Sequence, residues 1–180
     1  MKTIESENHK YHLDEQGRKQ GEFTEFDPET NRLKRVCNYV DDLKSGQEIE
    51  YDSYGQIKVR SNYLGGEKHG LFESFYDGKQ VFCHINYLDG KQDGLYITYL
   101  RDGDPREARY KKAGWLHGES IKNDRIGINE SHCIYENGRL KRDLRNKPFE
   151  NDEKKMAWAK RYQLPMLDLA IVKEMTKYSR

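Results

Sequence analysis

The sequence lacks any long hydrophobic run. No stretch approaches the roughly 18 consecutive apolar residues that a membrane-spanning helix needs, and the segment Met1–Glu7 has no apolar stretch of the kind that a signal peptide contains. The three cysteines, Cys37, Cys83 and Cys133, are odd in number and far apart, so they show no pattern of disulfide pairing. We therefore expect a cytoplasmic protein with reduced thiols.

The chain also lacks an excess of charge of one sign. Its formal net charge is +1, and residues 151–180 contain seven Lys or Arg against four Asp or Glu. The other residues therefore sum to a net charge of about −2, which is too little to steer the chain toward phosphates. Binding to nucleic acid or to a membrane is accordingly not the leading expectation.

Motifs of catalysis and cofactor binding are missing as well. The sequence has no GxSxG, phosphate-binding loop, HExxH or dinucleotide-binding pattern. Cys83-His84 and His132-Cys133 are adjacent pairs, which is not the spacing of metal ligands. We expect no enzyme activity, no catalytic residue, no metal, no cofactor and no small-molecule substrate.

What the chain does contain is aromatic residues in a polar background. Hydrophobic residues make up 34% of the sequence and charged residues 35%, a ratio near that of disordered chains. Thirteen tyrosines and six phenylalanines argue against disorder. Tyrosine can bury its ring while its hydroxyl stays hydrated, so this composition suits a thin, single-layer sheet.

One glycine and one tyrosine recur along the chain at a nearly constant interval. The glycines, called the anchor glycines below, are Gly21, Gly46, Gly70, Gly94 and Gly118. The tyrosines are Tyr39, Tyr63, Tyr87, Tyr110 and Tyr135. A period in the twenties is typical of stacked arrays in which each unit buries its apolar face against its neighbours.

Each repeat reads as a β-hairpin. An aromatic follows the anchor glycine by five residues in four units, and turns such as Asp77-Gly78-Lys79 and Asp89-Gly90 separate the runs. The pattern predicts a mainly β protein, an elongated array of antiparallel hairpins in one twisted sheet of about ten strands. The anchor glycine either makes room for a ring of a neighbouring hairpin, which we favour, or supplies turn geometry.

Charges follow the same period. First strands carry acids such as Glu25 and Glu73, and second strands carry bases such as Lys34, Arg35 and Arg60. We expect opposite charges to pair across neighbouring strands. A nucleic-acid groove would show bases without interleaved acids.

The pattern divides the chain into three parts. Residues 1–13 are a lead-in, residues 14–145 hold five units and a partial one, and residues 146–180 form a helical segment with helices near 152–163 and 165–178. The second helix carries an apolar stripe that includes Asp168. The stripe is made of Leu167, Ile171, Val172, Met175 and Tyr178. This segment either caps the sheet, which we favour, or docks on a partner.

An apolar pair, Trp115-Leu116, precedes the last anchor glycine, where most other units are polar. It either packs against the C-terminal helices, which we favour, or forms a binding anchor.

The segment Tyr87–Tyr99 (YLDGKQDGLYITY) resembles the MORN (membrane occupation and recognition nexus) repeat, and is most similar to the bacterial variant described as the antitoxin component of toxin–antitoxin systems. The resemblance covers about residues 14–142. It implies an elongated antiparallel sheet with an aromatic groove that binds proteins or lipids, and it implies no catalytic residues.

Two functional hypotheses follow. The first is a protein-binding module that neutralises or inhibits a toxin, effector or defence protein, as an antitoxin, an immunity protein or a phage-encoded antagonist. The second is peripheral binding of anionic lipid or nucleic acid through the basic second strands and the tail. For the first, we expect the partner to contact one open aromatic face, the Trp115 turn and the last helix. The predicted partner-binding residues are Tyr63, Phe75, Tyr87, Tyr99, Trp115, Leu116 and Asp168.

Overall fold

A computed structural model describes residues 1–123 and 129–144, and these residues form fifteen β-strands and no helix. The strands are β1 (Lys2–Glu5), β2 (His9–Leu13), β3 (Lys19–Phe26), β4 (Leu33–Val40), β5 (Leu43–Lys44), β6 (Gly46–Tyr51), β7 (Ile57–Leu64), β8 (Glu67–Lys68), β9 (Gly70–Phe75), β10 (Val81–Leu88), β11 (Lys91–Tyr99), β12 (Pro105–Lys112), β13 (Trp115–Asn123), β14 (Asn129–Glu136) and β15 (Arg139–Asp143). The helices predicted near 152–163 and 165–178 lie outside the described residues.

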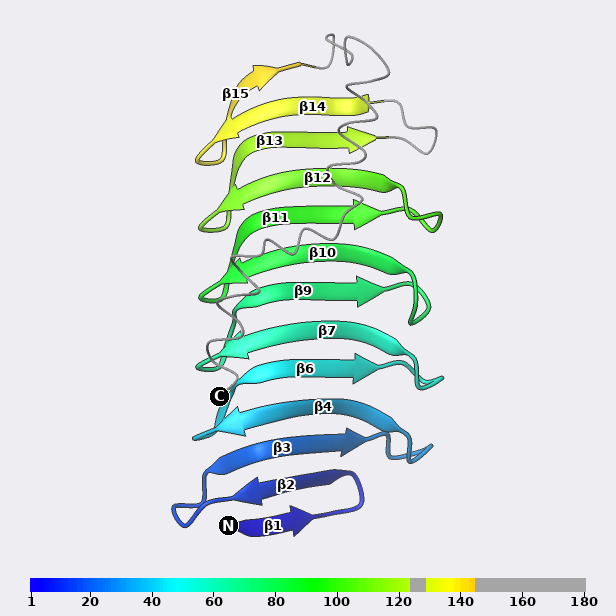
Figure 1. Cartoon of the computed structure of the whole chain (residues 1–180), viewed down its shortest axis with the longest axis vertical. Helices are drawn as coiled ribbons and strands as arrows, with labels where there is room; N and C mark the ends of the chain where they lie inside the picture. The colour runs from blue at the N-terminus through cyan, green and yellow to red at the C-terminus, as the bar shows by residue number, and fades with distance from the viewer. Residues whose placement is uncertain (124–128, 145–180) are drawn as a thin grey trace. The chain divides into compact units, whose positions relative to one another are not determined.

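The strands belong to one open antiparallel sheet in which strand order follows chain order, with β5 and β8 beside this path on β4 and β7. Contacts divide the chain into two units. The N-terminal unit holds residues 1–81 and 87–91, and the C-terminal unit holds residues 82–86 and those from Gln92 onward. Within each unit, successive hairpins lie side by side (Figure 1). The predicted mainly β, hairpin-repeat architecture is confirmed.

The predicted number of about ten strands is too low. Residues 1–13 form β1 and β2, and the partial last unit contributes β15. The other additional strands, β5 and β8, arise because the strand that enters each of these units is interrupted just before the anchor glycine. Gly46 and Gly70 have φ angles of +80° and +85°, and the other anchor glycines have positive φ as well, although β3, β11 and β13 run through them without interruption.

Two-residue turns join each unit to the next, and both of their residues have positive φ. At Gly65-Gly66 the angles are 58° and 88°, and at Asp89-Gly90 they are 46° and 75°. Two successive positive φ angles define the type I′ turn, whose twist matches that of an antiparallel hairpin. The hairpin predicted from Asp89-Gly90 is therefore confirmed.

Each of these turns is also hydrogen-bonded to the preceding hairpin. The second turn residue donates its N–H to the carbonyl oxygen of the residue two positions before an anchor glycine. The pairs are Asp42 to Lys19 (3.1 Å), Gly66 to Lys44 (2.9 Å), Gly90 to Lys68 (2.9 Å), Gly114 to Gln92 (2.8 Å) and Gly138 to Leu116 (2.8 Å). The turns are thus linked in series within each unit.

The favoured interpretation of the anchor glycines is wrong. No atom lies within 4 Å of a Cβ placed on Gly46, and the nearest atoms at Gly21 and Gly94 belong to Met1 and Asn86, so no ring packs on these three glycines. The constraint that all five anchor glycines share is their positive φ. Close packing without a ring occurs at the anchor glycine Gly94, where a Cβ would lie 3.2 Å from Asn86 Cβ, and it occurs also at glycines of the turns. A Cβ on Gly138 would lie 2.9 Å from the Trp115 ring, and one on Gly66 would lie 3.3 Å from Leu43 Cδ2.

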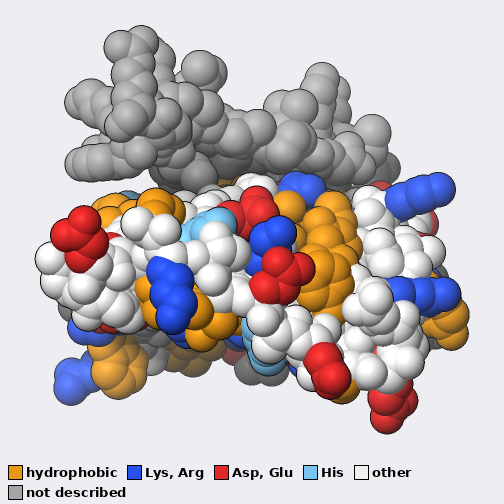
Figure 2. All heavy atoms as spheres, turned by 90° about the horizontal axis from the view of Figure 1, so that it is seen from below, with side chains coloured by type: hydrophobic (Ala, Val, Ile, Leu, Met, Phe, Trp, Pro, Cys, Tyr) orange, Lys and Arg blue, Asp and Glu red, His pale blue; other side chains and the backbone are white. Residues whose placement is uncertain are grey.

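The predicted pairing of charges across strands is present. Lys34 and Arg35 on β4 both contact Glu25 on β3, at 2.8 and 2.6 Å, and Arg60 on β7 contacts Glu73 on β9 at 2.9 Å. Figure 2 shows acidic and basic side chains interspersed on the face that it displays. Lys34, Arg35 and Arg60 are thus engaged by carboxylates of the same sheet.

Two glycine substitutions should separate backbone strain from crowding. Gly46→Ala places a Cβ in open space at φ +80°, so we expect a loss of about 1–2 kcal/mol of unfolding free energy. Gly78→Ala has a similar φ of +75°, but its Cβ would also lie 2.7 Å from Gln56 Cβ. We expect Gly78→Ala to cost about 1–3 kcal/mol more in urea unfolding. Equal losses for the two variants would contradict this assignment.

Candidate protein-binding surface

Tyr63 and Tyr87 occupy the same repeat position, and a lysine of the chain lies against each ring. Lys44 Nζ is 4.8 Å from the centre of the Tyr63 ring, and Lys68 Nζ is 5.3 Å from the centre of the Tyr87 ring. Phe72 contacts Tyr87 edge-on at 6.1 Å. These cation–π contacts stabilise the sheet and partly cover the rings that a partner was expected to meet.

Phe75 lies on the opposite face of the sheet from Tyr63, which corrects the prediction that the repeating rings share one face. The Arg60 guanidinium stacks on Phe75, 5.5 Å from the ring centre. Arg60 is three residues before Tyr63 on β7, and alternate residues of a strand point to opposite faces. Phe75, which contacts Arg60, therefore does not share a face with Tyr63.

Tyr99 is part of the core of the C-terminal unit. It is only 6% exposed, and its hydroxyl lies 3.2 Å from His84 Nδ1. Burial raises the pKa of Tyr99 to about 12. A side chain enclosed in this way offers little surface to a partner, so it contributes to stability.

Trp115 and Leu116 lie at the start of β13, and Trp115 is 65% exposed. One edge of its ring packs on Gly138, and the Leu116 carbonyl accepts the N–H of that glycine. The structure thus brings Trp115 and Leu116 together on one turn, with most of the indole in solvent. Asp168 lies outside the described residues.

The face that carries Tyr63 also contains a buried carboxylate. Glu48 is 1% exposed and contacts Lys44 Nζ, and Arg35 lies 3.6 Å away. Desolvation raises the pKa of the Tyr63 phenol, and its hydrogen bond to the Glu48 carboxylate raises it further. The Glu48 carboxylate is thus paired within the sheet, although the buried Arg35 Nε has no hydrogen-bond partner, and this pairing indicates a structural role.

Exposed aliphatic side chains flank the turns of the N-terminal unit, and the sequence analysis did not identify them. Leu43 is paired with Val40 across the first turn. The side chains, which we call the apolar turn row, are Val40 (53% exposed), Leu43 (50%), Leu64 (42%) and Leu88 (48%). Val40, Leu64 and Leu88 each follow the repeat tyrosine directly, in Asn-Tyr-Val or Asn-Tyr-Leu. That recurring tripeptide was the available signal.

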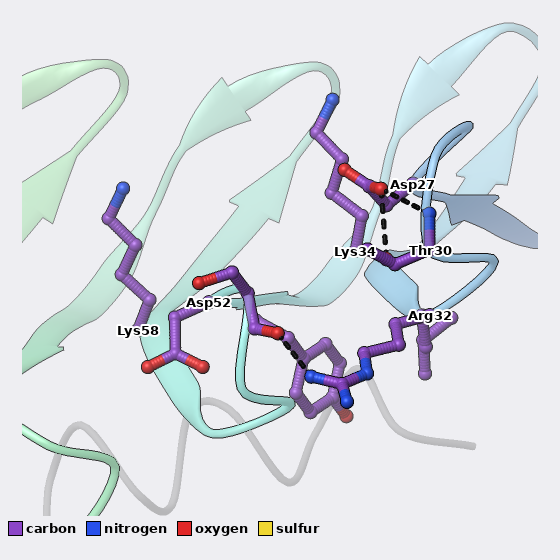
Figure 3. Close-up of a pocket in the computed structure, with 9 residues that line it drawn as sticks. Asp27, Thr30, Arg32, Lys34, Asp52 and Lys58 are labelled. Carbon is purple, nitrogen blue, oxygen red and sulfur yellow. Dashed lines mark hydrogen bonds between the residues drawn. The ribbon is translucent and has the colours of Figure 1, made fainter.

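A charged pocket of about 330 Å³ lies between the β3–β4 and β6–β7 loops (Figure 3). Arg32 reaches across to the second loop and donates to the Ser53 carbonyl at 2.6 Å. Asp27 accepts hydrogen bonds from Thr30, and Asp52 caps its own loop through the Tyr54 and Gln56 N–H groups. Because most of these charges already have partners, the pocket shows no distinct ligand chemistry.

The chain has no match among models of known protein families or among curated proteins. Within residues 1–123 and 129–144, no three His, Cys, Asp or Glu side chains lie close enough together to hold a metal ion. The same residues contain no helix with the length and apolar character needed to cross a membrane. The candidate site rests on exposure instead, namely on the side chains of the apolar turn row and on Trp115.

Replacing Lys44 should show that the Tyr63 face is structural. Lys44→Met leaves the buried Glu48 carboxylate with Arg35, 3.6 Å away and shared with Glu25, as its cation, so we expect a loss of about 3 kcal/mol in urea unfolding. Lys58→Met is the control, since no ion pair of Lys58 occurs among the described residues, and its effect should stay within about 0.5 kcal/mol. Similar losses for the two variants would contradict the structural role of Lys44.

Proposed function

We propose that this chain is a non-enzymatic protein-binding module that neutralises or inhibits a partner protein. The observation that carries the proposal is the apolar turn row, four aliphatic side chains that are 42–53% exposed at neighbouring turns of one unit. Exposed apolar side chains grouped at neighbouring turns are costly to leave hydrated, and such groups mark protein interaction sites more often than chance. Trp115 is a further exposed anchor of the kind enriched at binding hot spots.

The kind of partner follows from the MORN resemblance, which is also a proposal. A sheet of hairpins with a short, regular repeat is consistent with that family, whose bacterial variant is described as an antitoxin. We therefore propose that the partner is a toxin, an effector or a bacterial defence protein, and that the chain acts by covering it. This accounts for exposed binding residues without requiring any reaction.

Site-specific cross-linking tests the proposed function. A photoreactive amino acid at Leu64 or Trp115, in the full chain expressed in bacteria, should capture one defined protein. Tyr54, which is 80% exposed on the β6–β7 loop, provides the control position and should capture none. Co-expression of the chain should then suppress the toxicity or activity of the captured protein. Capture of only lipid or nucleic acid, or equal capture from Tyr54, would reject the proposal.

Trp115→Ala should weaken partner binding by about 2 kcal/mol while the chain keeps its fold. The side chain is 65% exposed, so its removal leaves the interior intact and removes contact area. Calorimetric titration of the captured partner, together with a thermal melt of the variant alone, measures both effects. A variant that loses its cooperative melt would show that Trp115 is needed for folding and that this placement is wrong.

A further inference from the structure

The apolar turn row is periodic along the sheet. Val40, Leu64 and Leu88 recur at the interval of the repeat, and each stands directly before a turn. Leu43 directly follows the first turn, and its side chain lies against Gly66 of the second turn. It therefore lies between these two turns. The row therefore runs across the strands, from turn to turn of the N-terminal unit.

The spacing of the row suits a helix better than an extended peptide. Successive positions are two strands apart, about 9.6 Å at 4.8 Å per strand. Residues seven apart on an α-helix are separated by about 10.5 Å and lie on nearly the same face. In an extended peptide, about 10 Å corresponds to three residues, whose side chains alternate between opposite faces. A helix with apolar residues at every seventh position can thus contact three successive turns.

The exposed charges beside the row are mostly negative, whereas the half-buried Lys44 and Lys68 lie against the Tyr63 and Tyr87 rings. The exposed acids at or next to the turns are Asp41, Asp42, Glu67 and Asp89. Arg18 pairs with Asp41, and His69 Nδ1 lies 3.3 Å from Asp89, yet the Asp89 side chain is still 76% exposed. Lys91 is the base at the equivalent position after the third turn. A helix with basic flanks would complement this rim.

We propose that the apolar turn row binds an amphipathic helix of the partner, with apolar residues at heptad spacing and basic residues beside them. This inference rests on the proposed function and names the class of partner segment. The row supplies the apolar contacts, while Asp42, Glu67 and Asp89 favour the basic flanks and fix the orientation of the helix.

Binding of labelled peptides to the full chain, measured by fluorescence anisotropy, tests the inference. The first peptide is three heptads long, with leucine at heptad positions and lysine on its flanks. The second has glutamate in place of lysine, and the third has the composition of the first with leucine at alternate residues. We expect the first to bind at least tenfold more tightly than either of the others.

Variants of the row locate the binding. Leu64→Ala and Leu88→Ala should each weaken binding of the first peptide by about tenfold, because each removes apolar contact area without changing charge. Tyr54→Ala is the matched control, an exposed side chain of the same unit on the β6–β7 loop, and should bind as the unchanged chain does. Equal binding by all variants, or equal binding of the three peptides, would overturn the inference.

Two further outcomes separate the alternatives. In the first, the peptide binds only to a variant that carries Leu167→Asp and Ile171→Asp. This result would show that residues 165–178 of the chain itself occupy the row, and it would overturn the inference. In the second, a protein cross-links at Leu64 and the first peptide does not displace it. This result would overturn the inference that the partner binds through an amphipathic helix, while the protein-binding function stands. Tight peptide binding without any captured protein would reject the proposed function alone.

Discussion

The stacking of hairpins depends on the hydrogen bond from each two-residue turn to the hairpin before it. The donor is the N–H of the second turn residue, and its acceptor is a carbonyl two residues before an anchor glycine. This geometry requires positive φ at both turn positions and at the anchor glycine that follows. Glycine adopts such angles at little cost, whereas a residue with a Cβ loses about 1–2 kcal/mol. The recurrence of glycine in the sequence therefore follows from this requirement for positive φ.

Residues 1–123 and 129–144 form one sheet without a second layer of secondary structure, and their side chains are covered differently on the Tyr63 face and at the turns. On the Tyr63 face, lysines from the turns lie on the aromatic rings, and Glu48 is enclosed by Lys44 and Arg35. Charged groups thus act as the cover that a second layer would supply. At the turns no such cover is found among the described residues, so Val40, Leu64 and Leu88 stay partly in solvent. The candidate site arises from this difference.

The sequence was sufficient to predict the hairpins, their repeat and the pairing of charges, because each of these depends on local spacing. It was insufficient for the role of the anchor glycine, because a glycine needed for positive φ and a glycine needed for close packing look the same in the sequence. It also failed for Phe75, because the aromatic pattern was read by the period of the repeat without following the alternation of side chains inside the strand. Exposure was harder still. Tyr63 and Leu64 are neighbours in the sequence. The contacts that surround them, the hydrogen bond of the turn and Lys44 on the Tyr63 ring, are visible only in the structure.

The repeat itself allows a comparison of what each position must be. The position after the turn holds Leu43, Glu67, Lys91, Trp115 and Arg139, five different side chains on one backbone geometry. Leu43, Glu67 and Trp115 each lie against the glycine of the next turn, within 2.9–3.5 Å of a Cβ placed there. Positive φ at the second turn position is kept in every unit, with Asp42 in the first turn and glycine in the others, while the side chain that follows the turn is apolar, acidic, basic or aromatic. A surface built in this way can change what it binds without changing its fold, which is the property that a protein inhibitor matched to one partner needs.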